Sequence, residues 1–217
     1  METREIGVFA QSGENLGGHP SIEYHFTIEM TAHQKLIRDH LAATEPALQA
    51  VDLSLARAVV APVHHRTAAT IILPYEWLGT MPAIPLYCYG IFFDGVLGGA
   101  VVFAAEPTEN LGVWDRYGFT GKIILLARGA CAHWTPKNTA SRLIGAAIRQ
   151  LPACYAVVTA TVDITAGEVG TIYQACNFAY VGNMSREQIS RPRRPPKRLP
   201  VPAGPATLWL AKAQLGP

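Results

Sequence analysis

The sequence has 217 residues, of which 49% are hydrophobic and 16% are charged. These proportions are typical of a folded domain with a filled core and exclude a chain that is disordered throughout. The formal net charge is only +2, so overall charge indicates no class of partner. Because the chain lacks a run of about 18 apolar residues and an apolar leader after Met1, we expect a cytoplasmic protein with no membrane contact.

The chain divides by composition into an arm and one domain. Residues 1–20 are polar and rich in glycine, which predicts a flexible N-terminal arm, and residues 21–217 form the expected catalytic domain. The four cysteines show no CxxC spacing, so a zinc cluster is not predicted.

The first half of the domain combines helical spacing with a strong hairpin signal. Apolar residues recur at helical intervals from Thr31 to Glu45, and a second helix is predicted from Val51 to Val60. Two apolar runs, Tyr87–Phe93 and Val96–Phe103, flank Asp94-Gly95. An Asp-Gly pair between such runs predicts a β-hairpin, because its turn requires positive φ angles.

The second half alternates strands with helices. The expected elements are a strand, a helix, a strand, a short helix, a strand, a proline-rich basic loop and a last strand, at 122–127, 137–151, 154–162, 169–176, 178–181, 185–205 and 206–211. This order predicts an α/β (α+β) domain with one central mixed, mostly antiparallel sheet flanked by helices.

The segment from Leu125 to Gly182 carries an ordered series of motifs. A strand ends at Arg128, and Pro-Lys-Asn followed by Ser141 opens a helix. A second strand ends at Asp163, and Gly-x-Ile-Tyr-Gln-Ala then leads through Asn-Phe to Tyr-x-Gly. In order and spacing, these motifs resemble the Mom family of phage DNA-modification proteins.

The resemblance implies a GNAT-like acyltransferase fold and an anti-restriction function in the host cytoplasm, if the chain is phage-encoded. It implies transfer of an acyl or carbamoylmethyl-type group to the exocyclic amine of adenine in DNA. The implied partners are double-stranded DNA and a small-molecule acyl donor, either acyl-CoA or another donor, with a homodimer left open. One departure concerns the donor. After Arg128 the chain reads Gly-Ala-Cys-Ala-His, without the usual glycine-rich diphosphate loop.

Four residues are candidates for catalysis. Asp163 at a strand end and Tyr173 in the short helix match the family's motifs and suit proton transfer. Glu76 lies between two aromatic residues, and the exclusion of water from its carboxyl group by their rings would raise its pKa. Ser141 in the first helical turn is the fourth. The alternative roles are an Asx turn for Asp163, core packing for Tyr173 and helix capping for Ser141.

Donor binding is assigned to the strand–helix junction. Arg128, Asn138 and Ser141 would form an anion site at a helix N-terminus, where free N–H groups favour negative charge. The alternatives are an Arg128 that pairs with an acidic neighbour to hold a loop, and an Asn138 that only caps the helix.

Nucleic-acid contacts are assigned to two places. Tyr75 and Trp77 would stack on an extruded base, or alternatively anchor their loop. The basic residues of the proline-rich loop would bind the phosphate backbone, or alternatively only aid solubility: they are Arg191, Arg193, Arg194, Lys197 and Arg198. The pair His64-His65 is more typical of a surface than of a metal site, so we assign no metal ligand.

These features lead to one main hypothesis, a phage-type enzyme that modifies DNA bases. Two alternatives remain open at this stage. One is a conventional acetyl-CoA-dependent GNAT N-acetyltransferase of a small amine or protein. The other is a catalytically inactive GNAT-like module that binds nucleic acid.

Overall fold

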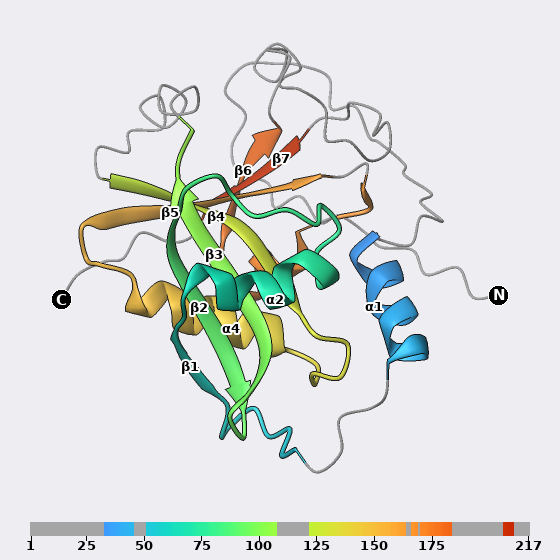
Figure 1. Ribbon diagram of the computed structural model, residues 1–217. Helices are drawn as coiled ribbons and strands as arrows, with labels where there is room; N and C mark the ends of the chain where they lie inside the picture. Colours follow the sequence, from blue (N-terminus) through green and yellow to red (C-terminus); the bar gives the residue numbers. More distant parts are fainter. Residues whose placement is uncertain are drawn as a thin grey trace.

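The computed structural model describes residues 33–45, 51–107, 122–163, 166–168, 170–183 and 206–210. The predicted arm at 1–20 and the basic loop at 185–205 lie outside these residues. The helices and strands follow one another as α1 (His33–Thr44), β1 (Val59–Pro62), α2 (His65–Tyr75), β2 (Pro85–Phe93), β3 (Val96–Ala105), β4 (Lys122–Cys131), α4 (Thr139–Gln150), β5 (Tyr155–Asp163), α5 (Thr171–Ala175), β6 (Ala179–Asn183) and β7 (Ala206–Leu210) (Figure 1).

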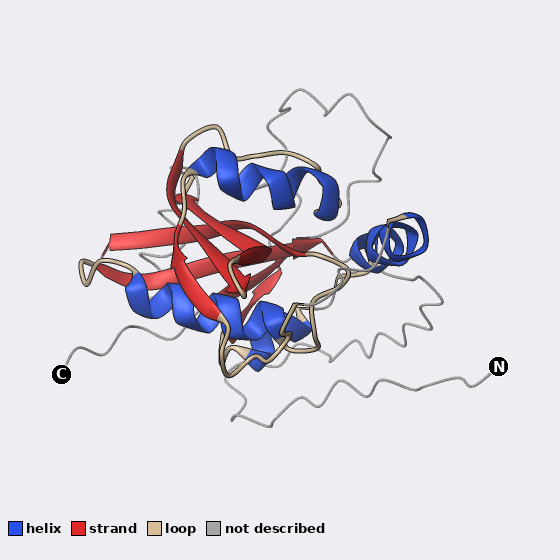
Figure 2. Cartoon of the chain, turned by 60° about the horizontal axis from the view of Figure 1, so that its bottom comes forward, coloured by secondary structure: helices blue, strands red, loops and turns tan. Residues whose placement is uncertain are grey.

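A single twisted sheet organises the described residues. Its strand order is β1-β2-β3-β4-β5-β7-β6, and every neighbouring pair is antiparallel except β4 and β5, which are parallel. Helices α2 and α4 lie on opposite sides of this sheet (Figure 2). The predicted α+β class with a mixed, mostly antiparallel sheet is therefore confirmed.

Two apolar clusters, one on each face, hold the helices to the sheet. Strand β3 contributes to both, because Val101 and Phe103 face the α4 side while Ala100 and Val102 face the α2 side. Its continuous apolar sequence reflects burial on both faces. The helical spacing of the α4 sequence likewise places Leu143 and other apolar residues in the first cluster.

Truncation of the central core residue should test the importance of this packing. Phe103 is fully buried, and its ring lies edge-on to Tyr89 with centroids 6.1 Å apart. We expect Phe103→Ala to lower the free energy of unfolding by about 3–5 kcal/mol in urea denaturation. The control Leu86→Ala, at a residue 42% exposed in β2, should change it by less than about 1 kcal/mol. Equal losses in both variants would contradict this account of the core.

The predicted helix at Val51–Val60 is wrong. This segment forms turns and then enters β1, where Val59 pairs with Phe92 of β2. Sheet pairing has overridden a weak helical pattern, as tertiary contacts often do. The helix lies instead at α2, which sequence reasoning missed because Pro74 interrupts its pattern.

Strand β4 is longer than predicted and carries a bulge. It continues to Cys131, so Arg128 lies inside the strand rather than after it. Val102 of β3 pairs with Arg128 and the next residue, Phe103, pairs with Leu126, which leaves Ala127 as the extra residue. Such bulges redirect the side chains of a strand and are common beside active sites.

Strands β4 and β5 part in the middle of the sheet. Among the described residues their parallel pairing ends at Leu126–Ala160. Beyond this pair, β4 continues along β3 to Cys131, and β5 continues along β7 to Asp163. We call the opening between the two diverging strands the splay. In the described part of the chain, backbone groups on the facing edges of both strands then have no neighbouring strand.

Candidate active site

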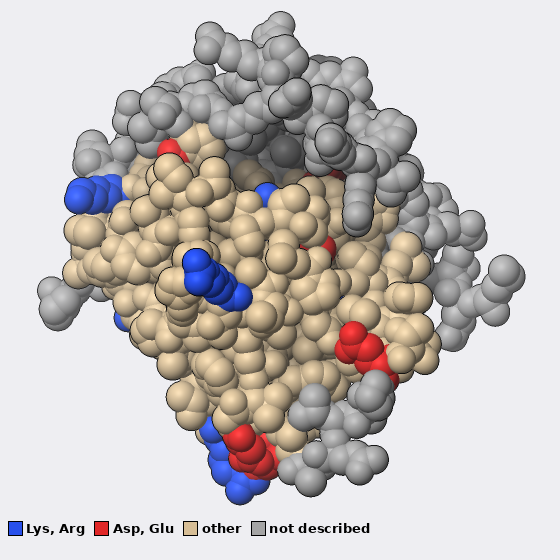
Figure 3. All heavy atoms as spheres, in the orientation of Figure 1, with Lys and Arg blue, Asp and Glu red and all other residues tan. Residues whose placement is uncertain are grey.

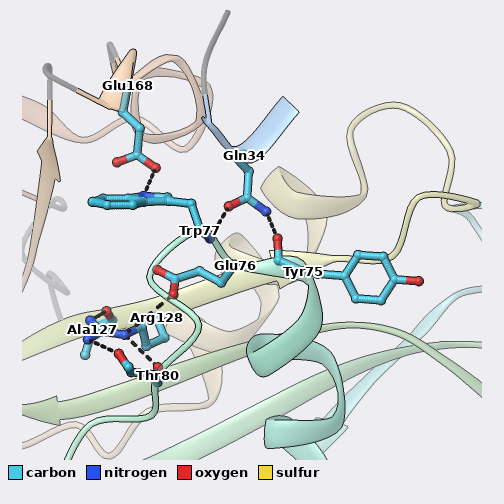
Figure 4. A network of polar contacts seen from close by, with 8 residues as sticks. All are labelled: Gln34, Tyr75, Glu76, Trp77, Thr80, Ala127, Arg128 and Glu168. Atoms are coloured by element: carbon cyan, nitrogen blue, oxygen red, sulfur yellow. Dashed lines mark hydrogen bonds and ion pairs between the residues drawn. The ribbon is translucent and has the colours of Figure 1, made fainter. Parts of the chain in front are cut away.

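Glu76 ends helix α2 and is the most strongly perturbed acid near the splay. Its residue is only 8% exposed, and its Oε2 atom, buried among the described residues, accepts no hydrogen bond there. This oxygen lies 3.8 Å from Nε of Arg128 (Figure 4). Burial raises the pKa of Glu76 to about 7, and the nearby Arg128 charge opposes this rise only in part. A carboxyl group with such a pKa exchanges protons readily at neutral pH.

Arg128 holds the loop that follows Glu76. Its Nε donates to the carbonyl of Thr80 at 2.9 Å, its Nη2 donates to Oγ1 of Thr80 at 3.1 Å, and its Nη1 donates to the carbonyl of Ala127 at 2.6 Å (Figure 4). The guanidinium therefore pairs with an acid and fixes a loop, which was the alternative role given above. Because Arg128 points to the loop after α2, it is not part of the α4 N-terminus.

A second acid, Glu168, links this loop to the end of β5. The indole N–H of Trp77 donates to Oε1 of Glu168 at 3.0 Å, and the backbone N–H of Asp163 donates to Oε2 at 3.3 Å (Figure 4). Burial raises the pKa of Glu168 above its usual value. Sequence reasoning missed this residue. The available signal was an acid five positions after Asp163, in a loop that follows a strand.

Tyr173 approaches the same acids from the α4 side of the sheet. It lies in α5 and packs on Phe178, with ring centroids 5.2 Å apart. Burial raises the pKa of its hydroxyl, and the negative charges of Glu168 and Glu76 raise it further. The hydroxyl therefore stays protonated at neutral pH and is suited to donate a proton. Glu76, Glu168 and Tyr173, with Asp163 beside them, form what we call the acid cluster.

The N-terminus of α4 carries Asn138 and Ser141, which were expected to form an anion site with Arg128. Asn138 has a left-handed backbone with φ of 70°, and its side chain makes no capping hydrogen bond, so the alternative role of helix capping is wrong. The hydroxyl of Ser141 donates to the carbonyl of Asn138 at 3.0 Å, within the first turn. The N–H of Thr135, in the preceding loop, and the N–H of Thr139, the first residue of α4, both donate to carbonyls of that loop. These groups are engaged internally, so a donor role for Asn138 and Ser141 stays a prediction.

Tyr75 serves as an anchor rather than as an exposed stacking surface. It is only 6% exposed and points away from Glu76 and Trp77 (Figure 4). Its hydroxyl donates to Glu45 at 3.2 Å and lies 3.0 Å from Nδ1 of His133. Trp77 is partly buried and remains the aromatic residue of this loop that borders the acid cluster.

On the face shown in Figure 3, the lysines and arginines of the described residues lie apart from one another. The predicted DNA-binding arginines and Lys197 lie outside the described residues. The ring of His64 accepts the N–H of Arg66 at 3.3 Å and so caps α2. Within the described ranges, no group of three His, Cys, Asp or Glu is arranged to hold a metal, and no helix could span a bilayer.

Comparisons with known proteins place the chain in a family. No curated protein sequence matches it. Among solved structures it is similar to a GNAT family acetyltransferase from Elizabethkingia anophelis with acetyl-CoA bound, at 12% identity and a TM-score of 0.49, covering 71% of this chain and 97% of that chain. It is also similar to a Bacillus subtilis acetyltransferase in complex with CoA, at 10% identity and a TM-score of 0.48, covering 72% and 97%.

The family match covers most of the described core and the site. The model of the Mom protein family matches residues 57–194, more than half of the chain, and this range includes Glu76, Arg128, Asp163, Glu168 and Tyr173. The family expected from the motifs is thus confirmed: the chain belongs to the Mom protein family.

Proposed function

We propose that the protein is an acyltransferase that modifies the exocyclic amine of adenine in DNA. Membership of the Mom family supports an acyltransferase-like function. The observation that carries the chemical part of the proposal is the buried carboxyl group of Glu76, with a pKa of about 7, at the splay between β4 and β5.

The acid cluster supplies both proton transfers that the reaction requires. The amine of adenine is a weak nucleophile, because its lone pair is delocalised into the ring. As its nitrogen bonds to the acyl carbon of the donor, the Glu76 carboxylate takes the proton that the nitrogen loses. As the bond from the acyl carbon to the donor's leaving group breaks, the Tyr173 hydroxyl protonates that group. One proton has then moved to Glu76 and one has left Tyr173, and proton exchange with water restores both.

The splay offers a place for the donor. Past Leu126 and Ala160, the facing edges of β4 and β5 have no strand partner among the described residues, so an extended donor can hydrogen-bond there as a strand would. The base would enter beside Trp77, whose ring is held by Glu168. A base in a duplex must first be rotated out of the helical stack to reach such a site.

We expect the basic loop to bind the phosphate backbone of DNA. Each phosphate neutralised adds about 0.9 to the salt slope of duplex binding, so replacing Arg193, Arg194 and Lys197 with Gln should lower that slope by about 2–3. Fluorescence anisotropy with duplex DNA over a range of salt concentrations gives the affinities from which this slope is measured. A control that replaces the exposed Lys35, Arg57 and Arg149 with Gln removes the same charge elsewhere. A loop variant with the slope of the wild type would show that this segment does not bind DNA.

Nucleoside mass spectrometry tests the proposed function. Plasmid from cells that express the chain should contain a modified deoxyadenosine, and plasmid from cells that express Glu76→Gln should contain little of it. If the wild type leaves only the standard nucleosides and their usual methylated forms, both in these cells and in the native host, adenine modification is wrong. Turnover of acetyl-CoA with small amines would then favour the conventional N-acetyltransferase.

A further inference from the structure

The side chain of Gln34 bonds to the backbone on both sides of Glu76. Its Nε2 donates to the carbonyl of Tyr75, and its Oε1 accepts the N–H of Trp77 at 3.2 Å (Figure 4). The orientation of the amide follows from its partners, because a carbonyl needs a donor and an N–H needs an acceptor. One primary amide thus satisfies two peptide groups just after helix α2 at the residues that flank Glu76.

This pair of bonds is part of a polar attachment of α1 to the site. Helix α1 contains no fully buried residue. One turn after Gln34, Arg38 donates to the carbonyl of His133 at 3.2 Å, in the loop between β4 and α4. After the helix end, Glu45 accepts the hydroxyl of Tyr75. Residues 34 and 38 therefore tie α1 to the end of α2, the loop after it and the loop after β4, and residue 45 ties the end of α1 to Tyr75 of α2.

We propose that Gln34 is a positioning residue that holds Glu76 in place at the splay. Glu76 directly follows helix α2. Its N–H donates to the carbonyl of Ile72, and the internal hydrogen bonds of the helix end with this one. Without Gln34, the carbonyl before Glu76 and the N–H after it lose their side-chain partners and turn to water. Displacement of a reacting group by about 1 Å can reduce the rate by about 10²-fold.

The charged and titratable groups that face Glu76 come from three other elements. They are Arg128 of β4, Glu168 of the loop after β5, and Tyr173 of α5. None of them belongs to α1. A change at Gln34 therefore alters the position of the Glu76 carboxyl group without removing a neighbouring charge. The pKa of Glu76 therefore reports on the position and burial of its carboxyl group in a Gln34 variant.

The test compares Gln34→Ala with His40→Ala, a change at an exposed position of the same helix. Carboxyl ¹³C NMR would follow the titration of Glu76, with its resonance identified by its absence in Glu76→Gln. In Gln34→Ala we expect water to reach the carboxyl group, so that its pKa falls toward 4.5, the ordinary value of a glutamate. We also expect kcat to fall about 10-fold to 10²-fold, while His40→Ala keeps both values. Gln34→Glu retains the acceptor for Trp77 but, as a carboxylate, cannot donate to the carbonyl of Tyr75, so we expect it to lose activity as well.

The outcomes separate this inference from the proposed function on which its kinetic part rests. An unchanged titration of Glu76 in Gln34→Ala overturns the positioning role, whatever the reaction. A lowered pKa with loss of kcat in Gln34→Ala and none in His40→Ala supports it. A lowered pKa in a protein that modifies no adenine leaves the positioning of Glu76 intact and contradicts only the proposed function.

Discussion

Replacement of Glu76 by Gln should reduce the rate of adenine modification by about 10²-fold or more, the usual loss when a general base is removed. The amide keeps the volume of the side chain but accepts no proton from the attacking amine. Because the pKa of Glu76 is about 7, wild-type activity should rise as pH increases through 7 and the carboxylate forms. Initial rates of product formation from pH 5.5 to 8.5, measured by nucleoside mass spectrometry, check both points. A variant with wild-type rates would remove Glu76 from the chemistry.

The pH dependence of the stability of Glu76→Gln is a control for the kinetic experiment. The folded protein holds the proton of Glu76 more tightly than the unfolded chain does, since the pKa rises from 4.5 to about 7 on folding. The folded state therefore binds more protons between these pH values, and its stability falls as pH rises through that window. A shift of this size corresponds to about 3 kcal/mol. Glu76→Gln should lack this fall and be more stable than the wild type at pH 8 in urea denaturation, which would separate loss of chemistry from loss of fold.

Tyr173→Phe should reduce activity by about 10²-fold as well, because it removes the proton donor to the leaving group. The phenyl ring keeps the packing on Phe178, so the melting temperature should change little. The loss should shrink with donors whose leaving groups are stable as anions, since these need no protonation. A loss of the same size with all donors would contradict the role of general acid.

Asp163→Asn is expected to lower activity less than Tyr173→Phe, because the two proposed proton transfers run through Glu76 and Tyr173. Asp163 ends β5, and its backbone N–H holds Glu168, so the variant tests the carboxylate without removing that bond. Wild-type turnover in both Asp163→Asn and Tyr173→Phe would assign the two residues to structure alone.

Local signals in the sequence were sufficient where the structure is local. Asp94 and Gly95 have φ angles of 46° and 80°, and they form the hairpin turn that their residue types predict. Helix α4 followed from its apolar spacing in the same way. The helix at α2 was missed because Pro74 and two adjacent histidines obscured its pattern, although buried Ile71 and its neighbours hold it against β3.

The site depends on contacts that no local pattern contains. Trp77 and Glu168 are 91 positions apart in the sequence. They meet only because α2 packs on the sheet that contains β5. The bulge at Ala127 determines the direction of Arg128, and no residue type there signals a bulge. The motifs indicated Asp163 and Tyr173, whereas Glu168 and Gln34 became apparent only in three dimensions.

The weak burial of α1 also has a consequence for hydrogen exchange. A helix with no fully buried residue opens by local fluctuations of low free energy, whereas the amides of β3 exchange only when the whole sheet unfolds. The bonds from Gln34 break in each such opening. We therefore expect Glu76 to lose the support proposed for Gln34 at a lower temperature than that at which the core melts, so that activity would be lost while the sheet is still folded.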